Sequence, residues 1–342
     1  MSRSAGSRTD SPDISDMTAT DASPPSWYRL HGLTVLSEVD LPEPTVDRHD
    51  PDVELVWDTN TSRQAIPGHA ETLAELSIED SPIYRVLRTD EGTTIVFRDT
   101  CSFQIDRELR SVACSPADGV DRKLVSILAG GALMAFLLTL GGSCVLHASA
   151  VVSRGRGLAI VGSAGMGKSS CAALFCTAGA ELMTDDVLRV ELDDASPGVV
   201  RGSSHLRLRE AAWSIVDLFE EAPRTTETVD GRLAVYPARG PETMQLDAAI
   251  VPSRYRDSDI VVERLTDAEA MWTLIQAPRI YGWKSPEVLS RSFTQLSEVV
   301  QRVPVLSLRM PWGPPFPADL GERALDEIHL ALGKDEPRSP RE

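Results

Sequence analysis

The stretch VGSAGMGKSS, residues 161–170, decides how this sequence is interpreted. From Gly162 to Ser169 it fits the pattern G-x-x-x-x-G-K-[ST]. It follows the apolar run LAIV (158–161) and opens the run KSSCAALFCTAG (168–179), an arrangement that predicts a buried strand, a glycine-rich turn and a helix ending at Gly179. Such a turn can aim backbone N–H groups at a phosphate, and the start of the helix adds its dipole.

The loop supplies a set of candidate nucleotide-binding residues. Its glycines let the backbone approach phosphates, Lys168 can reach the β- and γ-phosphates of ATP, and the Ser169 hydroxyl can bind Mg²⁺. A glycine-rich turn that binds nothing is the alternative. The candidates are Gly162, Ser163, Ala164, Gly165, Met166, Gly167, Lys168, Ser169 and Ser170.

Two adjacent acids, Asp185 and Asp186, follow the apolar run AELMT (180–184). Adjacent side chains at a strand end point to different sides, so one acid could hold Mg²⁺ and the other could accept the proton of an attacking hydroxyl. We assign Asp185 to the metal, although the pattern does not distinguish which acid is the base. No glutamate of the kind that positions water follows the pair, which favours phosphoryl transfer over hydrolysis. The alternative is an exposed pair at a strand end.

His147 lies in the apolar run CVLHASAVV (144–152), one short strand and one turn before the loop. That order can bring its imidazole beside the loop, where it could bond a phosphate oxygen or an acceptor hydroxyl. A histidine satisfied within the core is the competing interpretation.

Together these motifs resemble the catalytic domain of the HPr kinase/phosphorylase family. The shared features are Leu146-His147 opening a strand, the loop 162–169, the helix stop at Gly179 and the pair Asp185-Asp186. The resemblance is strong over residues 144–190 and recognisable to about 312. It implies an α/β P-loop kinase domain of the HPr kinase/phosphoenolpyruvate carboxykinase-like type, preceded by a smaller β-rich domain.

The resemblance also implies an activity: ATP and Mg²⁺ as cofactors, and a serine hydroxyl as acceptor. His147 would contact the transferred phosphate, Lys168 would neutralise it, and one acid of the pair would be the base. The bifunctional enzymes are oligomers, so a homo-oligomer is implied as well.

The sequence departs from the family where the bifunctional enzymes carry Glu-Ile-Arg-Gly. Here the segment reads VVRG (199–202), with Val199 in place of the glutamate that assists the metal. The reverse phosphorylase activity is therefore in doubt, and the HPr-docking signature is not evident. The chain looks more like the shorter HPr-kinase-related proteins, some of which phosphorylate a precursor peptide on serine in lasso-peptide pathways. By position, Arg207 and Arg232 are candidates for a clamp on the acceptor or the transferred phosphate.

The sequence and the resemblance together thus predict an ATP-dependent kinase acting on a serine of a protein or peptide. Two alternatives remain open: a small-molecule kinase with the same machinery, and a nucleotide-dependent switch without transfer. The net charge of −17 excludes free nucleic acid as a partner. The five cysteines are odd in number and show no C-x-x-C spacing, which predicts free thiols in a reducing, cytoplasmic compartment.

Four regions are expected along the 342 residues. We expect residues 1–26 to form a disordered tail without a signal peptide, and residues 334–342 to form a second disordered tail. Residues 27–118 predict a β-rich domain, with a hairpin at Asp90-Glu91-Gly92 and its histidines, His31 among them, on the surface or in loops. Residues 119–333 predict the kinase domain, including a helix within 205–222.

The uncharged run 125–146 is long enough to cross a bilayer. However, glycines interrupt the run near its end, no aromatic belt flanks it and no second span follows. These features favour a buried helix followed by a strand. We therefore expect no membrane span.

Overall fold

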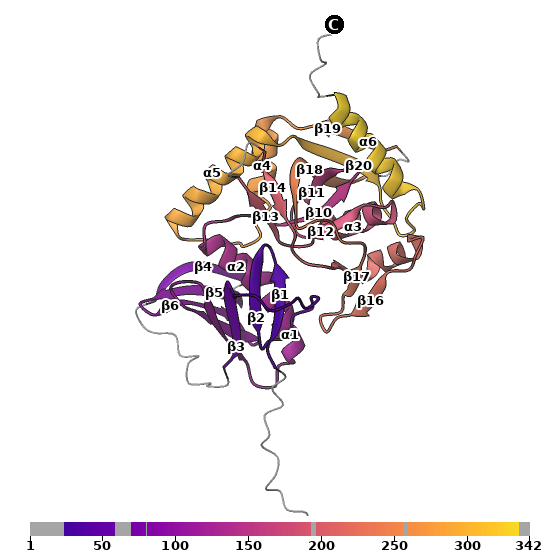
Figure 1. Cartoon of the computed structure of the whole chain (residues 1–342). Coiled ribbons are helices and arrows are strands. Elements are labelled where there is room, and N and C mark those ends of the chain that lie inside the picture. The colour runs from indigo at the N-terminus through magenta and orange to yellow at the C-terminus, as the bar shows by residue number, and fades with distance from the viewer. Residues whose placement is uncertain (1–23, 59–69, 80, 193–195, 256–258, 335–342) are drawn as a thin grey trace, which may run out of the picture.

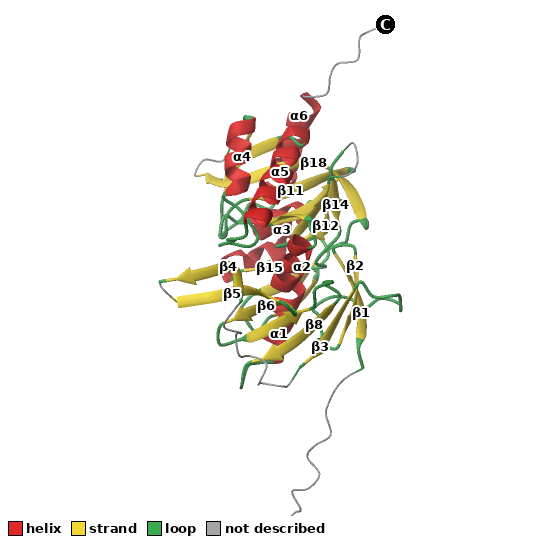
Figure 2. Cartoon of the chain, turned by 90° about the vertical axis from the view of Figure 1, so that its left-hand side faces the viewer, coloured by secondary structure: helices red, strands yellow, loops and turns green. Residues whose placement is uncertain are grey.

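The computed structural model describes residues 24–58, 70–79, 81–192, 196–255 and 259–334, and shows a mixed α/β protein built on several sheets (Figures 1 and 2). The first strand begins at Ser26 and the last helix ends at Lys334. The predicted tails lie almost entirely outside the described residues.

The first sheet has eight strands in the order β1-β2-β3-β8-β7-β6-β5-β4. All neighbours are antiparallel except β2/β3 and β3/β8. The expected hairpin is confirmed, since Thr89 pairs with Gly92 across the turn between β5 and β6. The strands are β1 (Ser26–Leu30), β2 (Leu33–Ser37), β3 (Val53–Trp57), β4 (Glu71–Ile78), β5 (Ser81–Thr89), β6 (Gly92–Phe97), β7 (Cys101–Ile105) and β8 (Ser111–Pro116).

An apolar helical segment packs on one face of this sheet. It comprises α1 (Arg122–Leu128), a π-helical turn η2 (Ala129–Leu133) and α2 (Met134–Leu140), and Asp121 caps its start by accepting from the Lys123 amide. Its side chains share one hydrophobic cluster with Ile95 and Phe103 of the sheet. We call this sheet and this segment the first core. The helical segment, which follows residue 118, thus packs with the first sheet. The domain boundary at residue 118 stays a prediction.

Within the described residues, Arg122–Leu140 is the one helix with the length and apolarity of a membrane span. However, 61% of its most apolar window is buried inside the protein. Strand β9 (Cys144–Leu146) follows it. The expectation of a buried helix followed by a strand is confirmed.

The second sheet is mixed and runs β12-β10-β11-β18-β14-β13-β9, with β20 beside β18 and β19 beside β20. Strand β11 is parallel to β18 and antiparallel to β10. The remaining strands are β10 (Ala148–Ser153), β11 (Arg156–Val161), β12 (Glu181–Thr184), β13 (Leu188–Glu191), β14 (Gly198–Val200), β18 (Thr243–Tyr255), β19 (Val261–Arg264) and β20 (Val305–Pro311).

Helices cover both faces of the second sheet, which explains why β11 reads as a continuous apolar run. Leu158 and Ile160 face the cluster of α3 (Lys168–Thr177) and α6 (Leu320–Lys334). Ala159 and Val161 face the cluster of α4 (Asp267–Ile275) and α5 (Pro286–Arg302). We call this three-layer unit the second core.

A small third sheet, β15-β17-β16, extends from the second core beside α3 (Figure 1). Its strands are β15 (Leu206–Leu208), β16 (Arg224–Glu227) and β17 (Leu233–Tyr236). The helix expected within 205–222 is wrong in kind: after β15 the chain forms a 3₁₀ helix, η3 (Glu210–Leu218). Only Ala212 and Ile215 of it are buried, so little packing enforces an α-helical repeat.

Candidate functional site

The glycine-rich loop joins the buried strand β11 to α3, as the sequence predicts. Gly162, Gly165 and Gly167 have φ values of 148°, 85° and 91°, a region that favours glycine. At Gly167 a Cβ atom would lie 2.4 Å from the ring of Trp312, so a side chain is excluded by space as well. The loop backbone therefore depends on these glycines.

Lys168 begins α3 and folds back over the loop. Its Nζ donates to the carbonyl oxygens of Gly162 at 2.9 Å and Ser163 at 3.2 Å, and only 6% of the residue is exposed. Burial lowers the pKa of the Lys168 ammonium, and the charges of Asp186 and Asp185 oppose that shift. A buried ammonium bonded only to neutral carbonyls is well placed to turn toward an anion that enters beside the loop.

A cavity of about 380 Å³ opens beside the loop. The sequence candidates that line it are His147, Ala164, Gly165, Gly167, Lys168, Ser169, Ser170, Asp186, Arg207 and Arg232. We call residues 162–170 the loop wall of this cavity. We call a second group of residues at this cavity the acid wall; it comprises His147, Asp185, Asp186 and their arginine partners.

Asp185 lies behind the cavity lining, with 5% of the residue exposed. Its Oδ1 accepts hydrogen bonds from the hydroxyls of Ser169, at 2.8 Å, and Ser149, at 2.6 Å. Its Oδ2 accepts one from the backbone N–H of Arg207 at 2.9 Å. All three donors are neutral, so the carboxylate keeps its charge available to a cation.

Asp186 faces the other way, into the cavity. Its backbone has a φ of 71°, which turns the side chain away from that of Asp185. Oδ1 lies 3.0 Å from His147 Nε2, and Oδ2 accepts from Arg279 at 2.8 Å. Burial by itself raises the pKa of Asp186, but the Arg279 charge and the His147 hydrogen bond outweigh it and hold the pKa below its usual range. This acid is ionised at neutral pH.

The strands around these acids are interrupted. The run 144–153 forms two strands, β9 and β10, with His147 between them. The run 180–192 is likewise β12 and β13, with both acids in the interruption. These breaks bring His147 and Asp186 together, since β9 pairs with β13 while β10 pairs with β12.

Arg207 and Arg232 meet at the third sheet. The Arg207 guanidinium donates to Asp230, and Arg232 Nε lies 3.5 Å from the same carboxylate. Arg207 Nε is buried without a partner. The structure therefore brings the two clamp candidates together on one carboxylate at the cavity rim.

Several cavity residues were missed from the sequence: Arg209, Arg254, Arg279, Trp312 and Phe316. Arg254 donates to the Gly165 carbonyl at 3.4 Å and lies 5.6 Å from the Trp312 ring centroid. Ser149, two residues after His147, bonds Asp185 and could have been found from strand alternation. Nothing local marks Arg279, which follows α4 in a loop.

The residues present fit Mg²⁺ with ATP. Within the described part of the chain no group of three or more His, Cys, Asp and Glu side chains could hold a metal by itself. The Asp185 carboxylate beside the Ser169 hydroxyl could instead supply one or two oxygen ligands, the number that Mg²⁺ takes from a protein when phosphates and water complete its octahedron.

Three further expectations can be compared with the structure. Val199 is buried in β14 within the second core and supplies no carboxylate to the cavity, consistent with the departure noted from sequence. All five cysteines are free and buried, as expected. His31 lies in a turn but is only 1% exposed, so a surface position is wrong for it.

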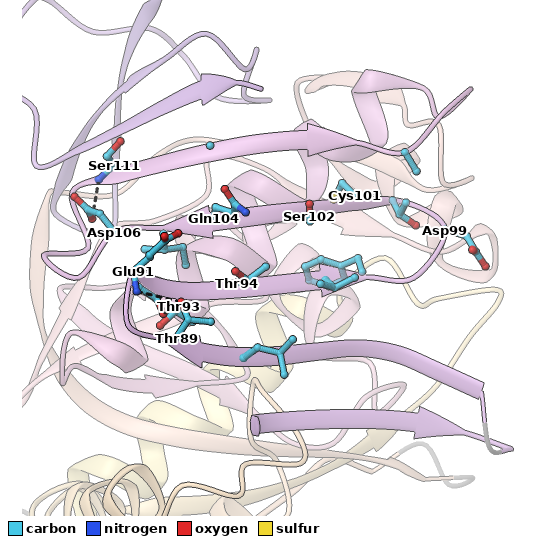
Figure 3. A pocket seen from close by; sticks show the side chains of 18 residues that line it. Thr89, Glu91, Thr93, Thr94, Asp99, Cys101, Ser102, Gln104, Asp106 and Ser111 are labelled. Carbon is cyan, nitrogen blue, oxygen red and sulfur yellow. Dashed lines mark hydrogen bonds between the residues drawn. The ribbon is translucent and has the colours of Figure 1, made fainter. Parts of the chain in front are cut away.

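A larger concavity, about 470 Å³, lies on the face of the first sheet opposite α1 and α2 (Figure 3). Thr94, Ser102 and Gln104 line it, whereas the alternating Ile95 and Phe103 pack against the helix. It contains none of the candidate residues and no arginine or lysine. Its size alone does not indicate phosphate chemistry.

No family model and no curated protein matches the chain. Among solved structures, the HPr(Ser) kinase/phosphatase from Coxiella burnetii is similar, with a TM-score of 0.30 and 13% identity. The match covers 55% of this chain and 98% of that one. A similarity at this level carries no information about activity.

Proposed function

We propose that the chain is an ATP-dependent kinase that transfers the γ-phosphate to a serine hydroxyl of a protein or precursor peptide, with Mg²⁺. One observation carries the proposal: the two adjacent carboxylates beside the glycine-rich loop have different kinds of partner. Asp185 bonds the loop hydroxyl of Ser169, and Asp186 faces the cavity between His147 and Arg279. A metal ligand and a proton acceptor are the two carboxylate roles that phosphoryl transfer needs.

The loop wall binds the nucleotide. Backbone N–H groups of residues 163–169 and the start of α3 hold the phosphates, and Lys168 exchanges its two carbonyl partners for the γ-phosphate. Ser169 and Asp185 hold Mg²⁺, which supplies charge neutralisation to the transferring phosphate when bound. Arg254, beside Gly165, adds a cation at the same wall.

The acid wall receives the acceptor. The serine oxygen forms a bond to the γ-phosphorus while the bond from that phosphorus to the β–γ bridging oxygen breaks, and ADP leaves. The hydroxyl proton passes to Asp186. Because the pKa of Asp186 lies below its usual range, its main contribution is to orient the hydroxyl, and the proton moves late, as the new bond forms.

The cavity is cationic in an acidic protein. It is lined by Lys168 and by five arginines, at positions 207, 209, 232, 254 and 279, and Asp186 is the one lining carboxylate among the described residues. The chain as a whole has a net charge of −17. Concentrating positive charge at one cavity favours a ligand with several negative charges, such as a triphosphate. Arg207 and Arg232 are placed to bind the transferred phosphate or the acceptor.

The test is phosphoryl labelling. Purified protein is incubated with γ-thiophosphate-labelled ATP, Mg²⁺ and extract of the source cells, with Asp186→Asn as control. Label in a protein or peptide that disappears with the variant supports the proposal and identifies the serine by mass. Label confined to small molecules supports a small-molecule kinase. ATP binding without any transfer supports a nucleotide-dependent switch.

A further inference from the structure

The segment that fixes Asp185 is held by the first core. Residues 201–205 connect β14 to β15, and in β15 the backbone N–H of Arg207 donates to Asp185 Oδ2 at 2.9 Å. This bond occupies one carboxylate oxygen and leaves the other facing Ser169. The orientation of the Asp185 carboxylate therefore depends on where residues 203–207 lie.

Glu43, in the loop after β2 of the first core, holds that segment from the other side. Its Oε2 accepts the backbone N–H of Ser204 at 2.8 Å, and its Oε1 lies 3.3 Å from Nδ1 of His205. The two side chains of this pair are 3% and 6% exposed. Burial by itself raises the pKa of Glu43, but the bond and the charge of His205 outweigh it, so the carboxyl group stays ionised.

A second contact reinforces the first. The His31 N–H donates to the Arg201 carbonyl at 2.9 Å. A Cβ atom on Gly202 would lie 2.2 Å from His31 Cε1 and 2.3 Å from the hydroxyl of Thr184, the residue before Asp185. The segment is thus confined between the first core and the end of β12, with no room for a side chain at Gly202.

The chemistry of the Glu43 contact indicates that its role is to position the segment 203–207 rather than to hold the two cores together. Apolar side chains can join two packed units at least as well as a buried ion pair, because burying charges costs nearly what their attraction returns. A carboxylate bonded to one particular N–H and one particular imidazole instead fixes the register of the segment it holds. That register places the Arg207 N–H on Asp185.

We propose that Glu43 is a positioning residue for the site: through Ser204 and His205 it places the Arg207 N–H, and thereby orients the Asp185 carboxylate toward the metal position beside Ser169. This role rests on the proposed function, in which Asp185 binds Mg²⁺. The first core is then part of the kinase site rather than an appendage to it.

The experiment compares Glu43→Ala with Glu38→Ala in the full chain. Glu38 is the control for loss of a carboxylate that accepts a backbone N–H: it accepts that of Trp57 at 2.8 Å, but it is exposed and its bond lies within the first core. Calorimetry measures ATP binding without metal and its dependence on Mg²⁺, and hydrogen exchange follows the amides of residues 203–208. We expect Glu43→Ala to weaken Mg²⁺ binding about tenfold, the scale seen for groups behind metal ligands. Metal-free ATP affinity should be unchanged, and exchange at 203–208 should accelerate.

Glu38→Ala should lower stability without either change. Unaltered Mg²⁺ affinity and unaltered exchange in folded Glu43→Ala would overturn the proposal. If that variant does not fold, Glu43→Gln keeps an oxygen for the Ser204 N–H but removes the charge, and a smaller loss of Mg²⁺ affinity is expected; no loss overturns the proposal. Failure of the proposed function itself is recognised separately, because the native chain would then transfer no labelled phosphate to a protein or peptide.

Discussion

The loop wall and the acid wall belong to the same cavity, yet they are assembled in different ways. Residues 162–170 of the loop wall are contiguous, and their shape follows from three glycines between a strand and a helix. The acid wall joins His147, Asp186 and Arg279, the last separated from Asp186 by 93 positions. A contiguous wall keeps its geometry through local backbone conformation, whereas a dispersed wall keeps it only while tertiary packing holds its segments together.

The segment carrying Arg279 shows this dependence. The chain after Arg279 lies along the edge strand β4 of the first core, where Glu75 N–H donates to the Gly282 carbonyl at 3.0 Å and Lys284 N–H donates to the Leu73 carbonyl at 2.7 Å. The Trp283 ring lies edge-on to Phe136 of α2, with centroids 6.0 Å apart. The first core therefore holds a partner of each acid, Arg207 for Asp185 and Arg279 for Asp186.

The largest effect is expected from the loop wall. Lys168→Ala removes the ammonium that neutralises the γ-phosphate, and we expect transfer to fall by at least about a hundredfold, with weakened ATP binding. The measurement is labelled-phosphate transfer together with calorimetric ATP affinity. Lys123→Ala, on the first turn of α1, serves as the control for loss of a lysine. Retained transfer by Lys168→Ala would remove the loop from the mechanism.

Asp186→Asn should affect the two walls unequally. Without the carboxylate, orientation of the hydroxyl and uptake of its proton are lost, which we expect to lower kcat about a hundredfold. ATP binding should persist, because the loop wall is intact. Asp185→Asn should instead weaken Mg²⁺ binding, since Asp185 bonds Ser169. Full turnover by Asp186→Asn, or identical effects of both substitutions, would contradict the division of roles.

Gly282→Ala tests whether the first core holds the acid wall. The new Cβ would lie 1.9 Å from the Glu75 carbonyl oxygen, so the segment must leave β4 and carry Arg279 with it. We expect kcat to fall roughly tenfold without change in ATP affinity, because small displacements of positioned groups are costly. Gly155→Ala is the matched control: its φ of 74° equals that of Gly282, but nothing lies within 4 Å of the added atom. Equal losses in both variants would attribute the effect to backbone strain.

The same contrast explains how far the sequence could predict the site. The loop, the helix after it and the acid pair were predicted because each depends on neighbours within one strand–turn–helix unit. Ser169 and Asp185 are only 16 positions apart, and their contact follows from that unit. Arg279 and Glu43 could not be predicted, because each reaches its partner across the boundary between the two cores and no periodic pattern marks such a contact. The run after β15 likewise fitted the pattern of an α-helix. It forms a 3₁₀ helix because only Ala212 and Ile215 are buried, so little tertiary packing favours the α-helical repeat.

The last prediction concerns stability rather than turnover, and tests the contact of His31 with Arg201 and Gly202 in the segment 201–205 through its dependence on pH. Burial lowers the pKa of His31 from 6.5 to about 4. The charge of Glu43 opposes this shift, and the charges of Arg189 and Arg279 add to it. A histidine with a lowered pKa binds fewer protons in the folded chain than in the unfolded one, so its neutral form favours folding above pH 6.5. That contribution is lost as the pH falls from 6.5 toward 4, and amounts to about 3 kcal/mol in total.

Urea unfolding of the native chain and of His31→Asn, measured at pH 7.5 and 4.5, checks this contribution. Asparagine suits position 31 because it tolerates the φ of 52° found there, and it does not titrate. The native chain should lose more of its free energy of unfolding between the two pH values than the variant does, since all other titrating groups are common to both. Equal losses would mean that His31 is solvated, and that its contact with Gly202 does not confine the segment leading to Arg207. A larger loss in the native chain would instead show that protonating His31 opposes folding, as expected for a histidine packed between the first core and Gly202.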